Sequence, residues 1–238
     1  GLITVVGDPS DVTDFIASNI AERQLPYVDL IRVPGTDSPF STIQVEASGK
    51  RCITHFGGCI RQLTLDMLDK NVLADAKMIH LGGLEEHFCG ELAAYCKRNT
   101  GALVSVDGGN LSREATDRML PYVDVFIPDD KTVAKVLGCS PEDACLYYAE
   151  RGVRISCVTM GDKGSVAYAG GTFHYAEPVR VSVVDTTGAG DNFNAGYCYA
   201  KLKGWAPEKC IRTAHRAASF YISHGYPVSG DVLEPDCE

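Results

Sequence analysis

The sequence predicts an α/β fold, a doubly wound and mostly parallel sheet with helices on both faces. Short apolar runs at 76–81, 102–106 and 123–127 are typical of buried strands, and the amphipathic segment 88–97 between the first two is typical of a helix. Strand, helix and strand in this order indicate parallel strands whose connecting helices cover the sheet. A chain of 238 residues is long enough for one or two domains with a full core.

The first quarter of the chain predicts smaller elements. An apolar strand over 1–8 precedes a helix over 12–22, for which Asp11 is the expected N-cap. Ser48-Gly49-Lys50 is expected to be the turn of a hairpin, and residues 63–68 suggest a short helix. The strands expected here cover 27–33, 40–47 and 51–56.

The rest of the chain continues the alternation. Ser140 as N-cap and Pro141 at the first position predict a helix over 141–151. Val183 and Val184 are expected to end a strand that leads into a turn containing two glycines. The other expected elements are a helical turn over 132–137, a strand over 155–159, a hairpin of 165–168 with 172–175, and helices over 193–202 and 207–223.

Composition limits the classes of function. Hydrophobic residues make up 45% of the chain and charged residues 22%, as in ordinary soluble globular proteins. A net charge of −9 argues against non-specific nucleic-acid binding and anionic-membrane binding. No apolar run reaches the ~20 residues of a membrane span. We therefore expect a cytoplasmic protein with neither a nucleic-acid nor a membrane partner, whose ten cysteines are mostly reduced and buried.

The chemistry is expected at Asp185-Thr186-Thr187-Gly188-Ala189-Gly190-Asp191. Gly188 and Gly190 allow backbone conformations closed to other residues, so consecutive N–H groups can point at one spot. That spot lies at the start of the next helix, whose dipole favours an anion. Asp185 and Asp191 bracket the turn. Two carboxylates suit an anion site if one takes a proton while a phosphoryl group passes between them and the amides.

This stretch, with the small-residue helix after it, resembles the Asp-Thr-x-Gly-Ala-Gly-Asp motif of the ribokinase (PfkB) family of carbohydrate kinases. The resemblance implies a ribokinase-like fold and transfer of the ATP γ-phosphoryl group to a sugar hydroxyl. It implies Asp191 as the catalytic base and the amides of Gly188, Ala189 and Gly190 as the anion hole. Asp185 and Asp191 are expected to contact the sugar. The pattern is most similar to fructoselysine 6-kinases and fructokinases.

The same resemblance implies a set of residues for ATP, Mg²⁺ and a monovalent cation such as K⁺. Thr159-Met160-Gly161-Asp162-Lys163-Gly164 is similar to the family's Thr-x-Gly-x-x-Gly element beside the phosphates. Asp129 and Asp185 are the expected metal residues, although Asp129 and Thr132 stand where the family usually has Asn and Glu. The residues expected to contact the nucleotide are Asp129, Thr159, Gly161, Gly164, Thr187, His215 and Gly225.

The resemblance also suggests how the chain is divided. Residues 27–56 resemble the strands of the family's β lid, and 1–26 with 57–238 are assigned to the main α/β domain. The family's opening strand and the Gly-Gly motif that grips the sugar would precede Gly1. We therefore expect the natural protein to carry a further N-terminal segment. A homodimer that forms through the lid is also expected.

Two other functions are compatible with the sequence. The chain could be a non-catalytic member of the family that binds a nucleotide or a partner as a sensor, as the altered metal residues suggest. It could also be a nucleoside or vitamin kinase of the same fold. Intact Asp191 favours an enzyme, and ATP consumption driven by a panel of sugars would separate the possibilities.

Overall fold

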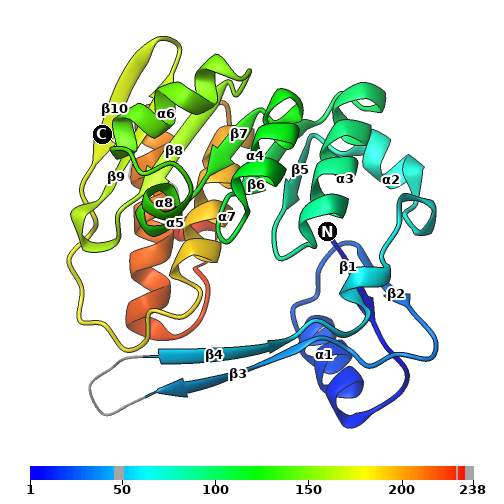
Figure 1. Ribbon diagram of the computed structural model, residues 1–238. Helices are drawn as coiled ribbons and strands as arrows, with labels where there is room; N and C mark the ends of the chain where they lie inside the picture. The colour runs from blue at the N-terminus through cyan, green and yellow to red at the C-terminus, as the bar shows by residue number, and fades with distance from the viewer. Residues whose placement is uncertain (46–50, 229, 234–238) are drawn as a thin grey trace. The chain divides into compact units, whose positions relative to one another are not determined.

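The computed structural model describes residues 1–45, 51–228 and 230–233, and the hairpin turn expected at 48–50 lies outside them (Figure 1). The chain forms two compact units, Gly1–Asp69 and Lys70–Glu238. The division expected from the sequence, in which 27–56 is a lid and 1–26 joins the main domain, stays a prediction.

The first unit contains two small sheets. Strands β1 (Leu2–Val6) and β2 (Val28–Arg32) pair in parallel, with helix α1 (Asp11–Glu22) between them in the chain. Strands β3 (Phe40–Val45) and β4 (Arg51–Phe56) form the expected antiparallel hairpin. The N-cap of α1 is Ser10 rather than Asp11, because the Ser10 hydroxyl accepts the N–H of Thr13 at 3.2 Å.

The helix expected over 63–68 is not formed. In its place are two short 3₁₀ turns, η1 (Gly58–Gln62) and η2 (Leu65–Met67). Leu63 and Leu68 both have extended backbone and are both buried. An irregular path therefore buries the leucines that the sequence pattern assigned to one face of a helix.

The second unit is built on a six-stranded sheet in the order β10-β9-β8-β7-β6-β5. The four strands β5 to β8 are parallel, whereas β9 and β10 form an antiparallel hairpin at one side. This confirms the predicted mostly parallel sheet. The strands are β5 (Met78–Leu81), β6 (Leu103–Asp107), β7 (Val125–Ile127), β8 (Ile155–Thr159), β9 (Ser165–Ala169) and β10 (Thr172–Ala176).

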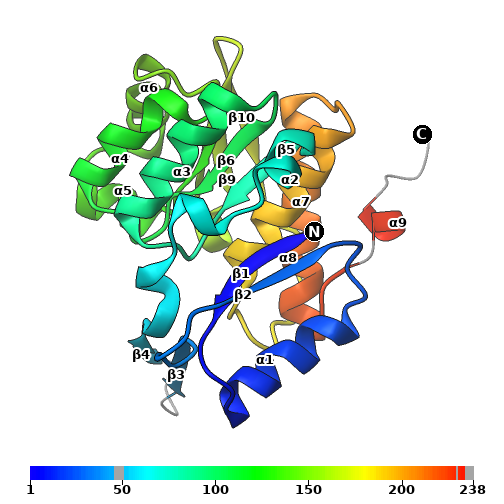
Figure 2. The same ribbon diagram turned by 90° about the vertical axis from the view of Figure 1, so that its right-hand side faces the viewer.

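Helices cover both faces of this sheet, as predicted. In Figure 2, α3 (Glu86–Asn99), α4 (Arg113–Met119), α5 (Asp130–Val136) and α6 (Pro141–Glu150) lie on one side, and α7 (Ala189–Leu202) and α8 (Pro207–His224) on the other. The sequence analysis did not identify α4 or the short α2 (Lys70–Asp75). The remaining elements are the 3₁₀ turns η3 (Leu120–Tyr122) and η4 (Gly161–Lys163) and the one-turn helix α9 (Gly230–Leu233).

The close packing of α7 against α8 depends on small residues. A Cβ on Gly196 would stand 2.7 Å from the Cβ of Ala217 and 3.0 Å from the Cα of Ala214. The inner faces of both helices are buried with β7, β8 and β9 in one core, to which Phe193, Tyr197 and Ile211 contribute large side chains.

The strand expected to end at Val183 and Val184 is absent, and residues 177–188 form an irregular segment. Val183 and Val184 are 55% and 73% exposed. The segment is attached to the end of α8 instead, where the N–H of Val184 donates to the Ile222 carbonyl at 2.8 Å. The valine pattern was misread because it suggests a strand whether or not a neighbouring strand lies within pairing distance.

Candidate active site

The turn that carries the predicted chemistry leads directly into helix α7. One oxygen of Asp185 accepts both the N–H and the hydroxyl of Thr187 at 2.9 Å. Gly188 then adopts the left-handed conformation, with φ 82° and ψ 5°, and serves as the N-cap of α7. The helix begins at Ala189, not at the expected Phe193, so Gly190 and Asp191 lie in its first turn. The macrodipole of α7 therefore acts directly on this turn.

The three amides expected to form the anion hole differ in their hydrogen bonds. The Ala189 N–H donates to the Thr186 carbonyl at 3.2 Å. The Gly188 and Gly190 N–H groups have no acceptor among the residues that the structure describes. A Cβ on Gly190 would meet nothing within 4 Å, so the space beside this residue is open. The N–H groups of Gly188 and Gly190 can therefore donate hydrogen bonds to an anion bound in the open space beside Gly190.

Asp191 and Asp107 line one cavity of about 350 Å³ with Gly82, Gly83 and Asn110. Asp107 is the last residue of β6, and its Oδ1 accepts the Gly109 N–H at 2.9 Å. Partial burial raises the pKa of Asp191, and the Asp107 carboxylate raises it further. The cavity thus places a basic carboxylate at the carboxyl ends of β5 and β6, where ligands bind in sheets of this type.

His80 has the opposite effect and offsets part of this rise in the pKa of Asp191. Its Nδ1 lies 3.1 Å from the Ser105 hydroxyl on β6. Burial lowers the pKa of His80 itself, whereas the carboxylates of Asp107 and Asp191 raise it. The three side chains therefore form one electrostatic group around the cavity.

Three of the expected nucleotide residues, Asp129, Thr159 and Gly164, lie at neighbouring positions of the same sheet edge. Asp129 pairs with Thr159 across a parallel bridge, and its Oδ1 accepts the N–H of Thr132 at 2.6 Å as the N-cap of α5. Thr159 in turn pairs with Ser165 at the start of β9. Gly164 has φ +89°, and a Cβ there would collide with the Ala176 carbonyl oxygen, so no other residue fits.

His215 is buried, with only 5% of its surface exposed. Its Nε2 lies 2.8 Å from the Ser165 hydroxyl, and its ring packs edge-on against Phe193. Burial lowers the pKa of His215 to about 4, so the ring is neutral near pH 7. His215 lies on α8, and these contacts pack its side chain against α7 and β9. Its contact with a nucleotide stays a prediction.

The two remaining glycines of the expected nucleotide site, Gly161 and Gly225, have open space beside them. Gly161 has φ +60° at the start of η4, and a Cβ would meet nothing within 4 Å. Gly225 caps α8 in the left-handed conformation and donates its N–H to the Tyr221 carbonyl at 2.8 Å. Tyr221 also touches the turn, because a Cβ on Gly188 would stand 3.2 Å from its ring. The end of α8 and the turn before α7 are therefore adjacent.

The described residues contain no cluster of three or more His, Cys, Asp or Glu side chains that could hold a metal ion without other ligands. Mg²⁺ usually takes one or two protein carboxylates and completes its shell with water and substrate phosphates. Asp129 and Asp185 each supply one carboxylate, which fits that mode. The nine cysteines among the described residues are all free.

An open α/β sheet with N–H donors at a helix N-terminus and a carboxylate beside them is compatible with the class of nucleotide-dependent phosphotransferases. Within this class, the model of the pfkB family carbohydrate kinases matches residues 1–231. The chain belongs to that family. This confirms the resemblance inferred from the Asp185–Asp191 motif.

Individual relatives agree with this assignment. Ribokinase of Arabidopsis thaliana is 24% identical over 208 residues, which are 82% of this chain and 55% of the relative, so the chain spans about half of that protein. A solved ribokinase of Thermotoga maritima has 23% identity and a TM-score of 0.78, over 98% of this chain and 77% of that chain. A putative ribokinase II of E. coli, solved with ATP and Mg²⁺, has 21% identity and a TM-score of 0.76, over 93% and 76% of the two chains. The structural neighbours show that the fold is ribokinase-like.

The site residues expected from the sequence did not include His80 or the Gly82-Gly83 pair. Gly82 and Gly83 follow directly after β5, and two glycines after a buried strand are a signal for a ligand crevice. His80 gave no such signal, because only the pairing of β5 with β6 brings it beside Ser105.

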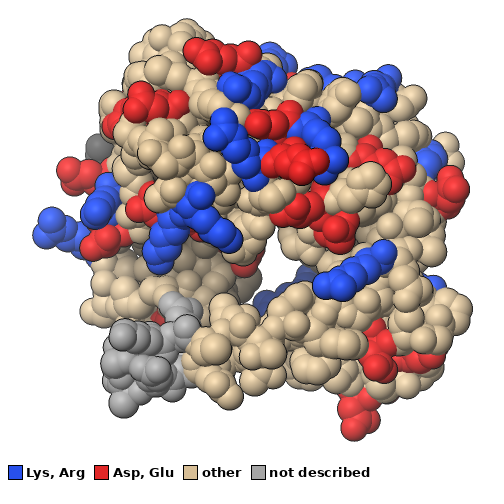
Figure 3. Space-filling model, viewed as in Figure 1, with Lys and Arg blue, Asp and Glu red and all other residues tan. Residues whose placement is uncertain are grey.

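On the face shown in Figure 3, Lys and Arg side chains are interspersed with Asp and Glu side chains. None of the helices in the described part of the chain is long and apolar enough to cross a membrane.

Proposed function

We propose that the protein is an ATP-dependent sugar kinase in which Asp191 is the general base. The observation that carries the proposal is the position of Asp191. It lies in the first turn of α7, directly after the Gly188 and Gly190 amides, and lines a cavity with Asp107. A raised pKa makes Asp191 a stronger base than an exposed aspartate.

In this reaction Asp191 accepts the proton of a sugar hydroxyl as its oxygen attacks the γ-phosphorus, and ADP leaves with the bridging oxygen. The Gly188 and Gly190 N–H groups, with Ala189 between them, stabilise the charge on the transferred phosphoryl group. When bound with the nucleotide, Mg²⁺ neutralises phosphate charge, and Asp129 and Asp185 would hold it. Thr187, Asp185 and the sheet edge at Thr159, Gly161 and Gly164 orient the substrates. The proposal also includes contacts of His215 and Gly225 with the adenine of ATP, and a bound K⁺.

The first candidate acceptors are a fructose-like and a ribose-like sugar. A nucleoside acceptor is the second candidate within the same chemistry. A homodimer through β3 and β4 and a cytoplasmic location complete the proposal.

The test is ADP release by the purified protein with ATP and Mg²⁺, against a panel of pentoses, hexoses, ketosugar derivatives and nucleosides. Acceleration by one sugar above the rate without acceptor supports the proposal. Acceleration by nucleosides alone would replace the sugar with a nucleoside. ATP binding without acceptor-dependent turnover would favour the sensor function instead.

A further inference from the structure

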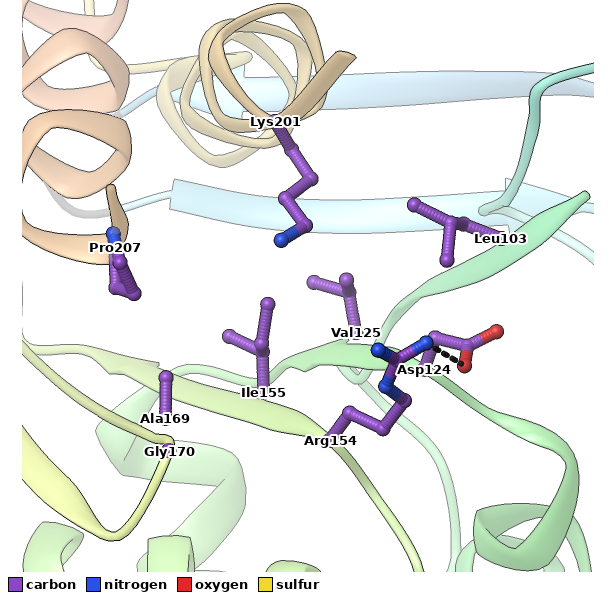
Figure 4. A pocket seen from close by; sticks show the side chains of 9 residues that line it. All are labelled: Leu103, Asp124, Val125, Arg154, Ile155, Ala169, Gly170, Lys201 and Pro207. Carbon is purple, nitrogen blue, oxygen red and sulfur yellow. Dashed lines mark ion pairs between the residues drawn. The ribbon is translucent and has the colours of Figure 1, made fainter. Parts of the chain in front are cut away.

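A second cavity, of about 530 Å³, lies at the opposite edge of the same sheet, among the residues that precede or begin its parallel strands (Figure 4). Leu103, Val125 and Ile155 are the first residues of β6, β7 and β8, whereas the candidate active site lies where these strands end. The proposed kinase reaction does not use this cavity. Its volume falls within the ~300–1,000 Å³ typical of small-molecule sites.

The floor of the cavity is apolar. Val125, Ile155 and Ala169 are buried residues of the sheet that line it, and Leu103 and Pro207 border it. In Figure 4 the side chains of Val125 and Ile155 stand up from the sheet into the open space. An apolar body placed here would be removed from water, which is favourable in proportion to the area buried.

One wall carries the buried carboxylate of Asp124, whose two oxygens both have partners. Asp124 is 2% exposed on its side chain, and its Oδ1 lies 2.6 Å from the Lys97 ammonium and 3.7 Å from the Arg154 guanidinium. Its Oδ2 accepts the N–H of Val104 at 3.0 Å. Lys97 and Arg154 together outweigh the single charge of this carboxylate, and of these two cations Arg154 lines the cavity.

Lys201 adds a cation from the other side. It lies in the last turn of α7, and Figure 4 shows its side chain extending from the helix toward the apolar floor. Lys201 forms no ion pair with the described residues. Helix α8 begins beside it at Pro207, and no side chain caps that N-terminus. The cavity therefore combines an apolar floor with unbalanced positive charge, in a chain whose net charge is −9.

We propose that this cavity binds an organic monocarboxylate with a hydrocarbon or aromatic body. The apolar floor accommodates the body, and the carboxylate faces Lys201. A small polar anion such as inorganic phosphate would leave the apolar floor uncovered, and a dianion would exceed the single net positive charge that Lys201, Arg154 and Asp124 leave on the lining. A neutral molecule would leave the Lys201 charge unpaired.

The probe is 2-naphthoate, titrated calorimetrically into the purified protein with and without saturating MgATP. Lys201→Met removes the charge and keeps the length of the side chain, whereas Lys201→Arg keeps the charge. Lys135→Met, an exposed lysine on α5, is the matched control. We expect Lys201→Met to weaken naphthoate binding at least tenfold, and the other two variants to stay within threefold of the parent.

Melting temperatures of all variants check that they are folded, and amide NMR shifts at Val125 and Gly170 locate the ligand. The proposal is supported if these amides shift, if MgATP does not displace naphthoate and if only Lys201→Met loses binding. It is overturned if Lys201→Met binds normally or if MgATP competes. Equal binding of neutral 2-naphthylmethanol, or competition by inorganic phosphate, would also contradict it.

Discussion

Gly196 of α7 lies so close to Ala217 of α8 that no side chain fits between them. A Cβ built on Gly196 would stand 2.7 Å from the Ala217 Cβ and 3.1 Å from the Thr213 carbonyl oxygen. We therefore predict that Gly196→Ala destabilises the protein by about 1–3 kcal/mol, the usual cost of overpacking a core. Urea unfolding measures this loss of stability. The control is Gly90→Ala on α3, where an added Cβ would meet nothing within 4 Å. An unchanged midpoint would show that the helices can move apart freely.

Asp191→Asn tests the proposed base. The amide keeps the shape of the side chain but cannot accept the proton, so we predict a fall in kcat of about 10²–10⁴. ATP affinity should stay within a few-fold, because the N–H groups of Gly188 and Gly190 are unchanged. Steady-state rates on the best acceptor and a nucleotide titration give both values. A variant that retains more than half of the parent kcat would rule out this assignment.

Substitutions of the two glycines of the turn, Gly188 and Gly190, are expected to have different effects on activity and stability. Gly190 is not in the left-handed region, and its Cβ would meet open space, so Gly190→Val should fold but block the approach of a phosphoryl group. Gly188 has φ +82°, and its Cβ would press on Tyr221, so Gly188→Val should also lose stability. Circular dichroism melts and turnover of both variants separate the effects. A folded Gly190→Val with parent activity would exclude the amide of Gly190 from the anion hole.

The sequence predicted what depends on local signals. The strands β5 to β9 are short apolar runs between turn residues, and Ser140-Pro141 begins a helix as expected. The Asp185–Asp191 motif located the turn because its glycines and carboxylates are consecutive. Each of these features is read from residues that are neighbours in the chain.

Features that depend on tertiary contacts were missed or misread. Val183 and Val184 look like a strand, but the segment binds the end of α8 through the Ile222 carbonyl. Helix α7 extends back to Ala189 because Gly188 can take a left-handed cap conformation, which the sequence permits but does not require. The electrostatic group of Asp107, Asp191 and His80 comes from β6, α7 and β5 and requires the folded sheet.

Substitutions of Asp107 and His80 are expected to shift the pH dependence of kcat/KM in opposite directions. Asp191 must be ionised to act as a base, so kcat/KM should fall as the pH drops through its raised pKa. Asp107→Asn removes a charge that raises this pKa, and the acid limb should move to lower pH. His80→Gln removes a group that lowers it, and the limb should move to higher pH. Shifts in the same direction for both variants would contradict the electrostatic arrangement, and Glu91→Gln on α3 is the control.

His215 makes stability depend on pH in the acidic range. Its pKa is lowered to about 4 in the folded protein because the ring is buried, whereas an exposed histidine titrates near 6.5. Between these values the unfolded chain binds more protons, so the stabilising contribution is complete above about pH 6.5 and is lost as the pH falls toward 4. The shift corresponds to about 3 kcal/mol at 1.36 kcal/mol per unit. We predict that His215→Gln loses stability at neutral pH but depends less on pH over this interval than the parent, measured by urea unfolding at pH 7, 6, 5 and 4.5. His174→Gln, a change on the edge strand β10, should follow the parent curve. An identical slope for His215→Gln and the parent would show that His215 is not the titrating group.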